Sequence, residues 1–119
     1  TILWYSIRNN NLEMTKLILS SKSIDVNLSD SDGKTPLLIA FEDNHFDIVK
    51  VLLQDSRFSL DSTSKIKDNQ NRNILWYSVR NDNLEMTKLI LTSKSIDMNL
   101  SDSDGKTPLL LLNMTNYKQ

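Results

Sequence analysis

The stretch SDSDGKTPLL at residues 29–38 occurs a second time, letter for letter, at residues 101–110. Three local structures share parts of this pattern. The letters DSDG resemble part of a calcium-binding loop, GKT resembles the end of a phosphate-binding loop, and TPL resembles the first turn of a helix. The choice among them decides whether a ligand site or only a structural turn is expected here.

Both ligand-binding interpretations fail at specific positions. When Gly33 takes the glycine position of a calcium loop, Leu28 takes the first ligand position and Ile39 the last, and neither side chain carries an oxygen. A phosphate loop requires a glycine where Leu28 stands. We therefore interpret residues 29–34 as the tip of a turn and expect no ligand there.

Four residues explain how such a turn leads into a helix. Gly33 can adopt a backbone conformation with positive φ that other residues resist. The carboxylate of Asp30 can accept N–H groups of the turn. Thr35 then serves as the N-cap of a helix, and Pro36 fits the first helical position because its missing N–H costs nothing there.

The repeated stretch belongs to a longer duplication. Residues 1–40 return as residues 73–112 after a shift of 72 positions. The two copies differ only at Thr1, Ile7, Asn10, Ser20, Val26, Ile39 and Ala40. A shorter period lies within each copy, because Thr1, Thr35, Asn73 and Thr107 follow one another at steps of 34, 38 and 34 residues.

Repeats of about 33 residues are typical of ankyrin repeats. The segment GKTPLLIA at residues 33–40 is similar to that family's G-x-T-P-L-H-x-A motif, with Leu38 in place of His. Residues 44–53 resemble the family's second helix. The resemblance covers essentially the whole chain and implies an all-α fold, an ankyrin-type solenoid of stacked helix–turn–helix repeats with projecting β-turn tips. The expected organisation is one domain, 1–119, with repeats at about 1–29 (partial), 30–67, 68–101 and 102–119 (partial).

The spacing of apolar residues favours the same architecture. A helix is expected from about Phe46 to Gln54, with Ile48, Val49, Leu52 and Leu53 on one face. Similar apolar faces are expected at Met14, Leu17 and Ile18 and at Met86, Leu89 and Ile90. Each helix pair has one apolar side, so pairs must stack to bury it. We expect Trp4 and Trp76 to pack against neighbouring repeats rather than to stack on nucleic-acid bases.

Composition argues against several classes of function. The formal net charge of −1 gives no basic footprint for nucleic acid or an anionic membrane. The chain has no cysteine, and no apolar run approaches the ~20 residues of a membrane helix. His45 is the only histidine, so it has no second imidazole or thiol with which to bind a transition metal. We expect an intracellular, cytoplasmic protein that is not an enzyme and has no metal or cofactor.

The ankyrin resemblance implies a binding surface for a partner protein. In this family the turn tips and the inner faces of the first helices form a concave surface. The corresponding residues here are Arg8, Asn9, Ser31, Asp32, Lys34, Glu42, Asp43, Asn69, Gln70, Arg72, Arg80, Asn81, Ser103, Asp104 and Lys106. The preferred hypothesis is a non-catalytic protein–protein interaction module, and the alternative is an architectural spacer within a larger protein.

The first and last repeats raise a separate expectation. Neither has the polar outer face that a terminal repeat requires, and residues 109–112 are four consecutive leucines. Exposed apolar patches usually mark interfaces. We therefore expect either a segment of a longer array, or a chain that self-associates end to end or exchanges matching elements between copies.

Overall fold

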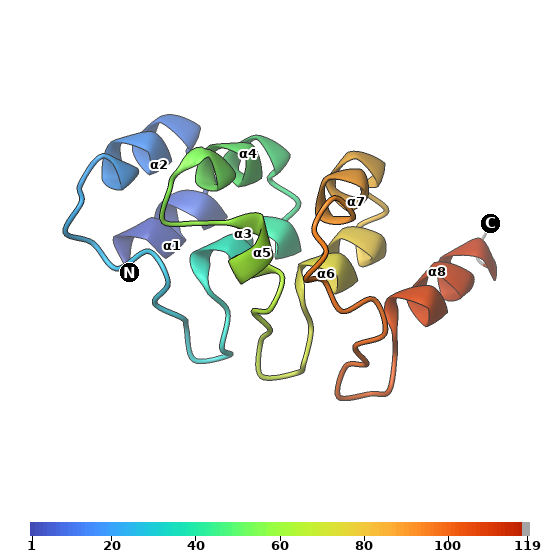
Figure 1. The fold of residues 1–119 in the computed structure, drawn as a ribbon. Coiled ribbons are helices and arrows are strands. Elements are labelled where there is room, and N and C mark those ends of the chain that lie inside the picture. The colour runs from blue at the N-terminus through green and yellow to red at the C-terminus, as the bar shows by residue number, and fades with distance from the viewer. Residues whose placement is uncertain (118–119) are drawn as a thin grey trace.

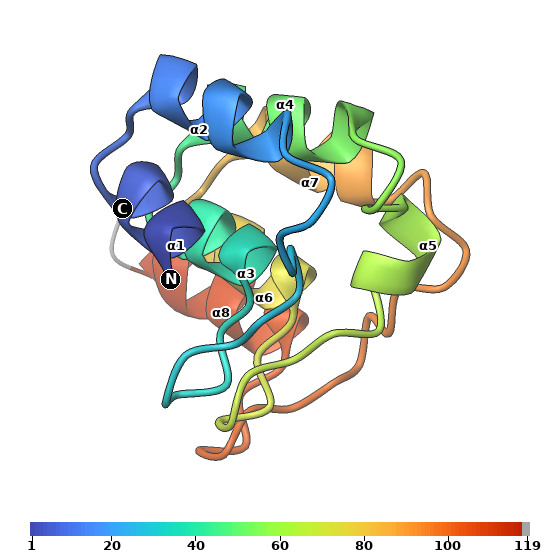
Figure 2. The ribbon, with the colours of Figure 1, turned by 90° about the vertical axis from the view of Figure 1, so that its left-hand side faces the viewer.

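The computed structural model describes residues 1–117, apart from the side chains of residues 61, 62 and 114–117. Helices of this part of the chain form two rows, and the loops project from one side of them (Figures 1 and 2). The inner row, next to the loops, is α1 (Ile2–Arg8), α3 (Pro36–Glu42), α6 (Ile74–Arg80) and α8 (Pro108–Tyr117). The outer row is α2 (Leu12–Leu19), α4 (Phe46–Gln54) and α7 (Leu84–Ile90), and the short α5 (Leu60–Thr63) lies in the connection from α4 to α6.

This arrangement confirms the expected all-α stack of helix pairs. Residues 1–117 contain no strand, and the predicted helix from Phe46 to Gln54 is present with those bounds. Packing runs between successive inner helices, from α1 to α3, α3 to α6 and α6 to α8. Residues 118–119 of the expected last repeat lie outside the described residues. No helix within residues 1–117 has the length and apolar character needed to cross a membrane.

Side-chain caps fix where the inner helices begin. The hydroxyl of Thr35 accepts the N–H of Leu38 at 3.3 Å, and the amide oxygen of Asn73 accepts the N–H of Trp76 at 2.9 Å. Pro36 occupies the first turn of α3, as predicted. The outer helices α2 and α7 begin in the same way, with Asn11 and Asn83 as N-caps.

The turn tips have the predicted geometry. Gly33 has a φ of 78° and Gly105 a φ of 79°. The Oδ1 atom of Asp30 accepts the N–H groups of Asp32 and Lys34, both at 2.9 Å. The middle tip uses Asp68 and the last tip uses Asp102 in the same manner. Each tip is therefore held by one carboxylate that bonds two N–H groups of its own turn.

Stacking determines which apolar side chains are buried. Ile2 is 63% exposed and Tyr5 is 69% exposed, whereas their counterparts 72 residues later, Ile74 and Tyr77, are both 0% exposed. The sequences of α1 and α6 differ only at Ile7, which is valine in the second copy. The difference arises because α6 packs between α3 and α8, whereas α1 packs on α3 alone among the inner helices.

The same effect corrects one expectation about α2. Met14 and Leu17 were expected on a buried face with Ile18, but both are exposed and only Ile18 is buried. In the second copy Met86 is fully buried. Within residues 1–117, no helix pair packs against the side of α2 that carries Met14 and Leu17. The apolar spacing of α2 therefore marks a face that has no neighbour.

Arg57 connects two repeats through the end of α2. Its guanidinium donates to the carbonyl oxygens of Leu19 and Ser21, and it also bonds both carboxylate oxygens of Asp55. The last carbonyl groups of a helix lack partners within the helix, so this arginine satisfies the carbonyl of Leu19, the last residue of α2, and that of Ser21 just beyond it. Hydrogen bonding and the nearby charge of Arg57 lower the pKa of Asp55 from 3.8 to about 2.

Replacement of Arg57 by Ala is expected to lower the free energy of unfolding by about 1–3 kcal/mol, because hydrogen bonds to a charged group are lost. The loss should depend on pH. A carboxyl group whose pKa is lowered by folding stabilises the folded state. This stabilisation is fully present above 3.8, the pKa of Asp55 in the unfolded chain, and is lost as the pH falls toward 2. Denaturation of both proteins between neutral and acidic pH measures this. A difference that persists unchanged at the acidic end would contradict the role given to Asp55.

Replacement of Leu52 by Ala is expected to cost ~2–5 kcal/mol, because Leu52 is fully buried between α4 and its neighbours. Asp47 lies exposed on the same helix, and Asp47→Ala should stay within ~0.5 kcal/mol. Chemical denaturation of the two variants measures the difference. Equal midpoints would show that the register of α4 is wrong.

Candidate functional site

The turn tips form a continuous polar row. The backbone N–H of Asn69 donates to the carbonyl of Asp32 at 2.9 Å, and the N–H of Ser103 donates to the carbonyl of Gln70 at 2.9 Å. The side-chain amide of Asn69 also donates to the carbonyl of Ser31 at 3.2 Å. Three tips from segments far apart in sequence are thus linked, and the links hold them at fixed positions relative to one another.

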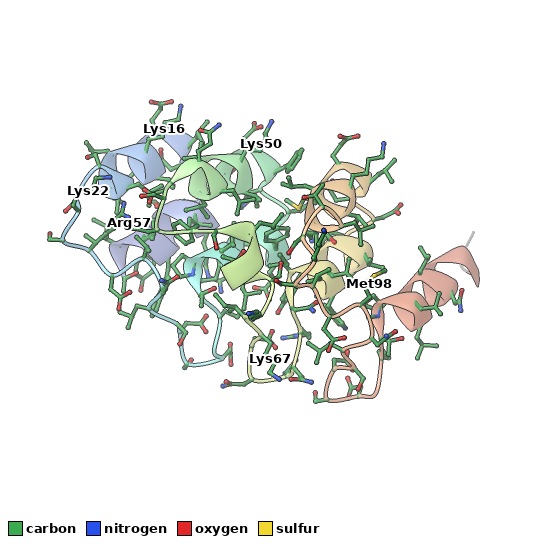
Figure 3. All side chains as sticks on the ribbon, in the orientation of Figure 1. Lys16, Lys22, Lys50, Arg57, Lys67 and Met98 are labelled. Carbon is green, nitrogen blue, oxygen red and sulfur yellow. The ribbon has the colours of Figure 1, made fainter. Side chains whose placement is uncertain are left out.

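The exposed side chains of this row are the tip residues that the sequence predicted. Those in the exposed class are Ser31, Asp32, Asn69, Gln70, Ser103 and Asp104, together with Arg8, Asn9 and Arg80 from the inner helices. The outer helices present a separate face, where Lys16 and Lys50 point away from the tips (Figure 3).

The remaining predicted residues are less accessible because other parts of the chain engage them. Lys34 is buried and its ammonium pairs with Glu42. The amide of Asn81 donates to the carbonyl of Phe41 at 2.7 Å at the end of α3. Arg72 bonds the carboxylate of Asp68 at 2.9 Å. Asp43 and Lys106 are partly exposed.

In the first half of the surface, opposite charges gather around one arginine. Arg8 lies 3.6 Å from Asp30, 3.5 Å from Glu42 and 3.6 Å from Asp43. Lys34 approaches Glu42 from the neighbouring tip. The fields of these charges largely cancel, and at the partly exposed sites each pair contributes little to stability.

In the second half, a buried carboxylate organises the centre. Asp68 accepts hydrogen bonds from the hydroxyl of Tyr77 and the Nε of Arg72. Burial by itself would raise the pKa of Asp68, but the bonds from Tyr77 and Arg72 outweigh it and the net pKa is lowered. Burial, followed by the bond to Asp68, raises the pKa of Tyr77 well above its ordinary value. The tyrosine is therefore a neutral hydrogen-bond donor at neutral pH.

The two tryptophans serve packing. Trp76 is buried, and its indole N–H donates to the carboxylate of Asp102 at 3.0 Å. Trp4 is half-buried, and its indole N–H donates to the carbonyl of Leu28 at 2.8 Å. Neither ring presents an open stacking platform, as the sequence predicted.

The tip aspartates Asp30, Asp68 and Asp102 have a second role that the sequence did not predict. Asp30 was expected only to hold its own turn, yet Asp30 and its counterparts Asp68 and Asp102 each also contact a side chain of an inner helix. The recurrence of aspartate at the same position of every tip was the signal that could have indicated this role. Among the described residues, no group of three or more His, Cys, Asp or Glu side chains is placed to hold a metal ion.

An apolar groove of about 320 Å³ opens between α6, α7 and α8. Leu91 is 47% exposed in this groove, whereas its counterpart Leu19, which has α4 beside α2, is 6% exposed. Met98 lies beside the start of α8 (Figure 3). The groove is thus the place that an outer helix such as α4 occupies in the first half.

Tyr77→Phe is expected to destabilise the protein by about 1–3 kcal/mol, because Asp68 stays buried with one donor fewer. The matched control is Tyr5→Phe, at the corresponding position of the first copy, where the ring is exposed and the change should stay within ~0.5 kcal/mol. Thermal or urea unfolding of the two variants gives the comparison. Equal effects would contradict the organising role of the Asp68 carboxylate.

Comparison with known proteins agrees with this architecture. The family description "Ankyrin repeats (3 copies)" matches residues 1–64, which is more than half of the chain. The transient receptor potential cation channel subfamily A member 1 of Homo sapiens is 29% identical over 118 residues, covering 98% of this chain and 10% of that protein. The putative ankyrin repeat protein FPV022 of fowlpox virus (strain NVSL) is 29% identical over 118 residues, covering 80% of this chain and 20% of that protein.

A third relative matches a shorter part. The acyl-CoA-binding domain-containing protein 6 of Danio rerio is 41% identical over 49 residues, 41% of this chain and 16% of that protein. The chain therefore spans a fifth or less of the length of these relatives. The family match, the repeat period and the stacked helix pairs agree, and the chain belongs to the ankyrin repeat family.

Proposed function

We propose that this chain is a non-catalytic protein-interaction module that binds a partner protein through its concave surface. Ankyrin repeats are generally protein–protein interaction modules, which supports the class of function. The observation that carries the choice of surface is the row of exposed polar tips joined by backbone hydrogen bonds. A prealigned row loses little conformational entropy on binding, which favours affinity.

The relatives support a transferable module. Their names denote a member of a cation channel subfamily, a viral ankyrin repeat protein and a protein with an acyl-CoA-binding domain. The function of each whole protein is not carried over, because this chain matches only a small share of its length. What they share with this chain is the repeat stack, which is a scaffold on which different surfaces are built.

The test uses three exposed tip residues with no side-chain bond to the rest of the described structure: Asp32→Ala, Gln70→Ala and Asp104→Ala, combined in one variant. Peptides selected from a displayed random library against the parent chain are the probe. They should bind this variant at least about tenfold more weakly, a loss of about 1.4 kcal/mol.

The matched control removes exposed charges on the outer helix α7, as Glu85→Ala with Lys88→Ala. This control should bind the selected peptides as the parent does. Peptides that lose affinity only for the outer-face variant would contradict the proposed surface. A library that yields no binder at all would favour the alternative, an architectural spacer.

We also propose that copies of this chain associate end to end. Ile2 and Tyr5 of α1 are exposed, whereas Ile74 and Tyr77 are buried in the stack of α6 between α3 and α8. Leu109 and Leu110 of α8 are also exposed. In the chain α6 packs on α3. Because α8 corresponds to α3 and α1 corresponds to α6, the exposed face of α1 in a second copy can pack on α8 in the same way.

Light scattering should show a mass that rises with concentration in the parent chain. The Ile2→Asp variant should stay monomeric. A parent chain that is monomeric at every concentration would contradict this proposal.

A further inference from the structure

We infer that the part of the concave surface around Arg80 and Lys106 recognises an acidic segment of the partner protein, whose carboxylates take the place that Glu42 and Asp43 hold in the first half. The inference rests on the proposed function, because it specifies the partner chemistry of the same surface. The duplication supplies an internal reference, since the same cations occur twice in different surroundings.

The first copy shows what these cations bind when acids are present. Arg8 lies within 3.5–3.6 Å of the carboxylates of Asp30, Glu42 and Asp43. Lys34 pairs with the same Glu42 from the next tip. The positions of the arginine and the lysine are therefore suited to hold a shared carboxylate between them.

The second copy keeps both cations and lacks two of the acids. Arg80 corresponds to Arg8 and Lys106 to Lys34, each after 72 residues. At the same shift, Glu42 and Asp43 are replaced in the sequence by Met114 and Thr115, which carry no carboxylate. The sequence change removes two negative charges and leaves both positive charges.

The third acid of the second copy is present but already engaged. Asp102 corresponds to Asp30, and its Oδ1 accepts the N–H groups of Asp104 and Lys106. Its Oδ2 accepts the indole N–H of Trp76 at 3.0 Å. In the first copy the indole of Trp4 donates to a backbone carbonyl instead, which leaves the second oxygen of Asp30 for Arg8.

Arg80 consequently lies over aromatic rings. Its guanidinium carbon is 5.5 Å from the ring centre of Trp76 and 5.8 Å from that of Tyr77. Arg72 lies over the same rings and is neutralised by Asp68. Among the side chains that the structure describes, neither Arg80 nor Lys106 forms an ion pair. Cation–π contacts orient the guanidinium while its N–H donors remain available.

Carboxylates of a protein fit this site better than a nucleic acid. The rings of Trp76 and Tyr77 are buried, so bases have no open face on which to stack. Asp82 and Asp104 are exposed in the same half and oppose a long run of phosphates. A few discrete acidic side chains can reach Arg80 and Lys106 without meeting those aspartates, which favours a mixed acidic peptide over a polyanion.

Three synthetic ligands test the inference: a serine–glycine peptide that carries a few glutamates, the same peptide with glutamines in their place, and a thymidine oligonucleotide of equal charge. The parent chain should bind the glutamate peptide most tightly. Arg80→Gln with Lys106→Gln should weaken that binding by about tenfold or more. The matched control, Lys88→Gln with Lys94→Gln, removes the same charge from exposed positions elsewhere and should leave binding nearly unchanged.

A restoring variant tests the internal reference itself. Met114→Glu with Thr115→Asp returns the two acids of the first copy, and it should weaken binding of the glutamate peptide about as strongly as loss of the two cations. Thermal melting of every variant verifies that each is folded.

Four outcomes would overturn the inference. These are no binding of the glutamate peptide by the parent chain, equal or tighter binding of the oligonucleotide, equal weakening by the two glutamine double variants, and unchanged binding after the acids are restored. The proposed function and this inference fail on different results. If the library peptides depend on Asp32, Gln70 and Asp104 but not on Arg80 and Lys106, the interaction module is supported and the acidic partner is ruled out.

Discussion

Each helix pair of this chain has apolar side chains that only an adjacent pair can cover, and the structure depends on that one constraint. Ile74 and Tyr77 are fully buried because α6 has inner helices on both sides. The same residue types at Ile2 and Tyr5 are exposed because α1 has an inner neighbour on one side only. Sequence alone does not set burial in a stack. Position in the stack sets it, as expected when each repeat contacts only its neighbours.

Stacking also fixes the surface. Once the inner helices lie side by side, the tips between them lie within backbone hydrogen-bond distance, as the Asn69 to Asp32 and Ser103 to Gln70 bonds show. The aspartate of each tip serves both its own turn and the adjacent inner helix. The polar row that we propose as the binding surface is thus a direct consequence of how the apolar faces are covered.

Duplication explains why the two halves of this surface differ. Nearly the same residues occur in both, yet the first half neutralises its cations with Glu42 and Asp43, and the second half has no acid in those two positions. An additional difference arises at the tryptophans, where Trp76 takes a carboxylate oxygen that its counterpart leaves free. Replacement of two acids just outside the duplicated segment therefore changes the electrostatic surroundings of an arginine and a lysine that are the same in both copies.

The repeat architecture and the helix starts could be predicted because they depend on local chemistry. Thr35 and Asn73 cap helices through contacts three residues away, and Gly33 takes its positive φ within its own turn. The bounds of α4 followed from its apolar spacing. These features need no knowledge of the neighbours.

Properties that depend on neighbours could not be predicted from the pattern. The exposure of Leu17 and the burial of Lys34 are set by which helix or carboxylate lies opposite. Two partly buried residues of the predicted concave surface, Arg72 and Asn81, belong to the same class, because their partners, Asp68 and the end of α3, come together with them only in the folded chain. The sequence predicted that the turn tips form the candidate surface, but the structure was needed to determine which of its side chains are exposed.

Native-state hydrogen exchange of α1 and α6 tests the central claim most directly. The two helices differ at a single residue, Ile7 against Val79, so their intrinsic exchange rates are nearly the same and only their positions in the stack differ. We expect the amides of α6 to exchange far more slowly than those of α1, because opening α6 disrupts packing on both of its sides. Equal protection of the two helices would contradict the account, because it would mean that the helices are stabilised by their own sequences and not by their neighbours.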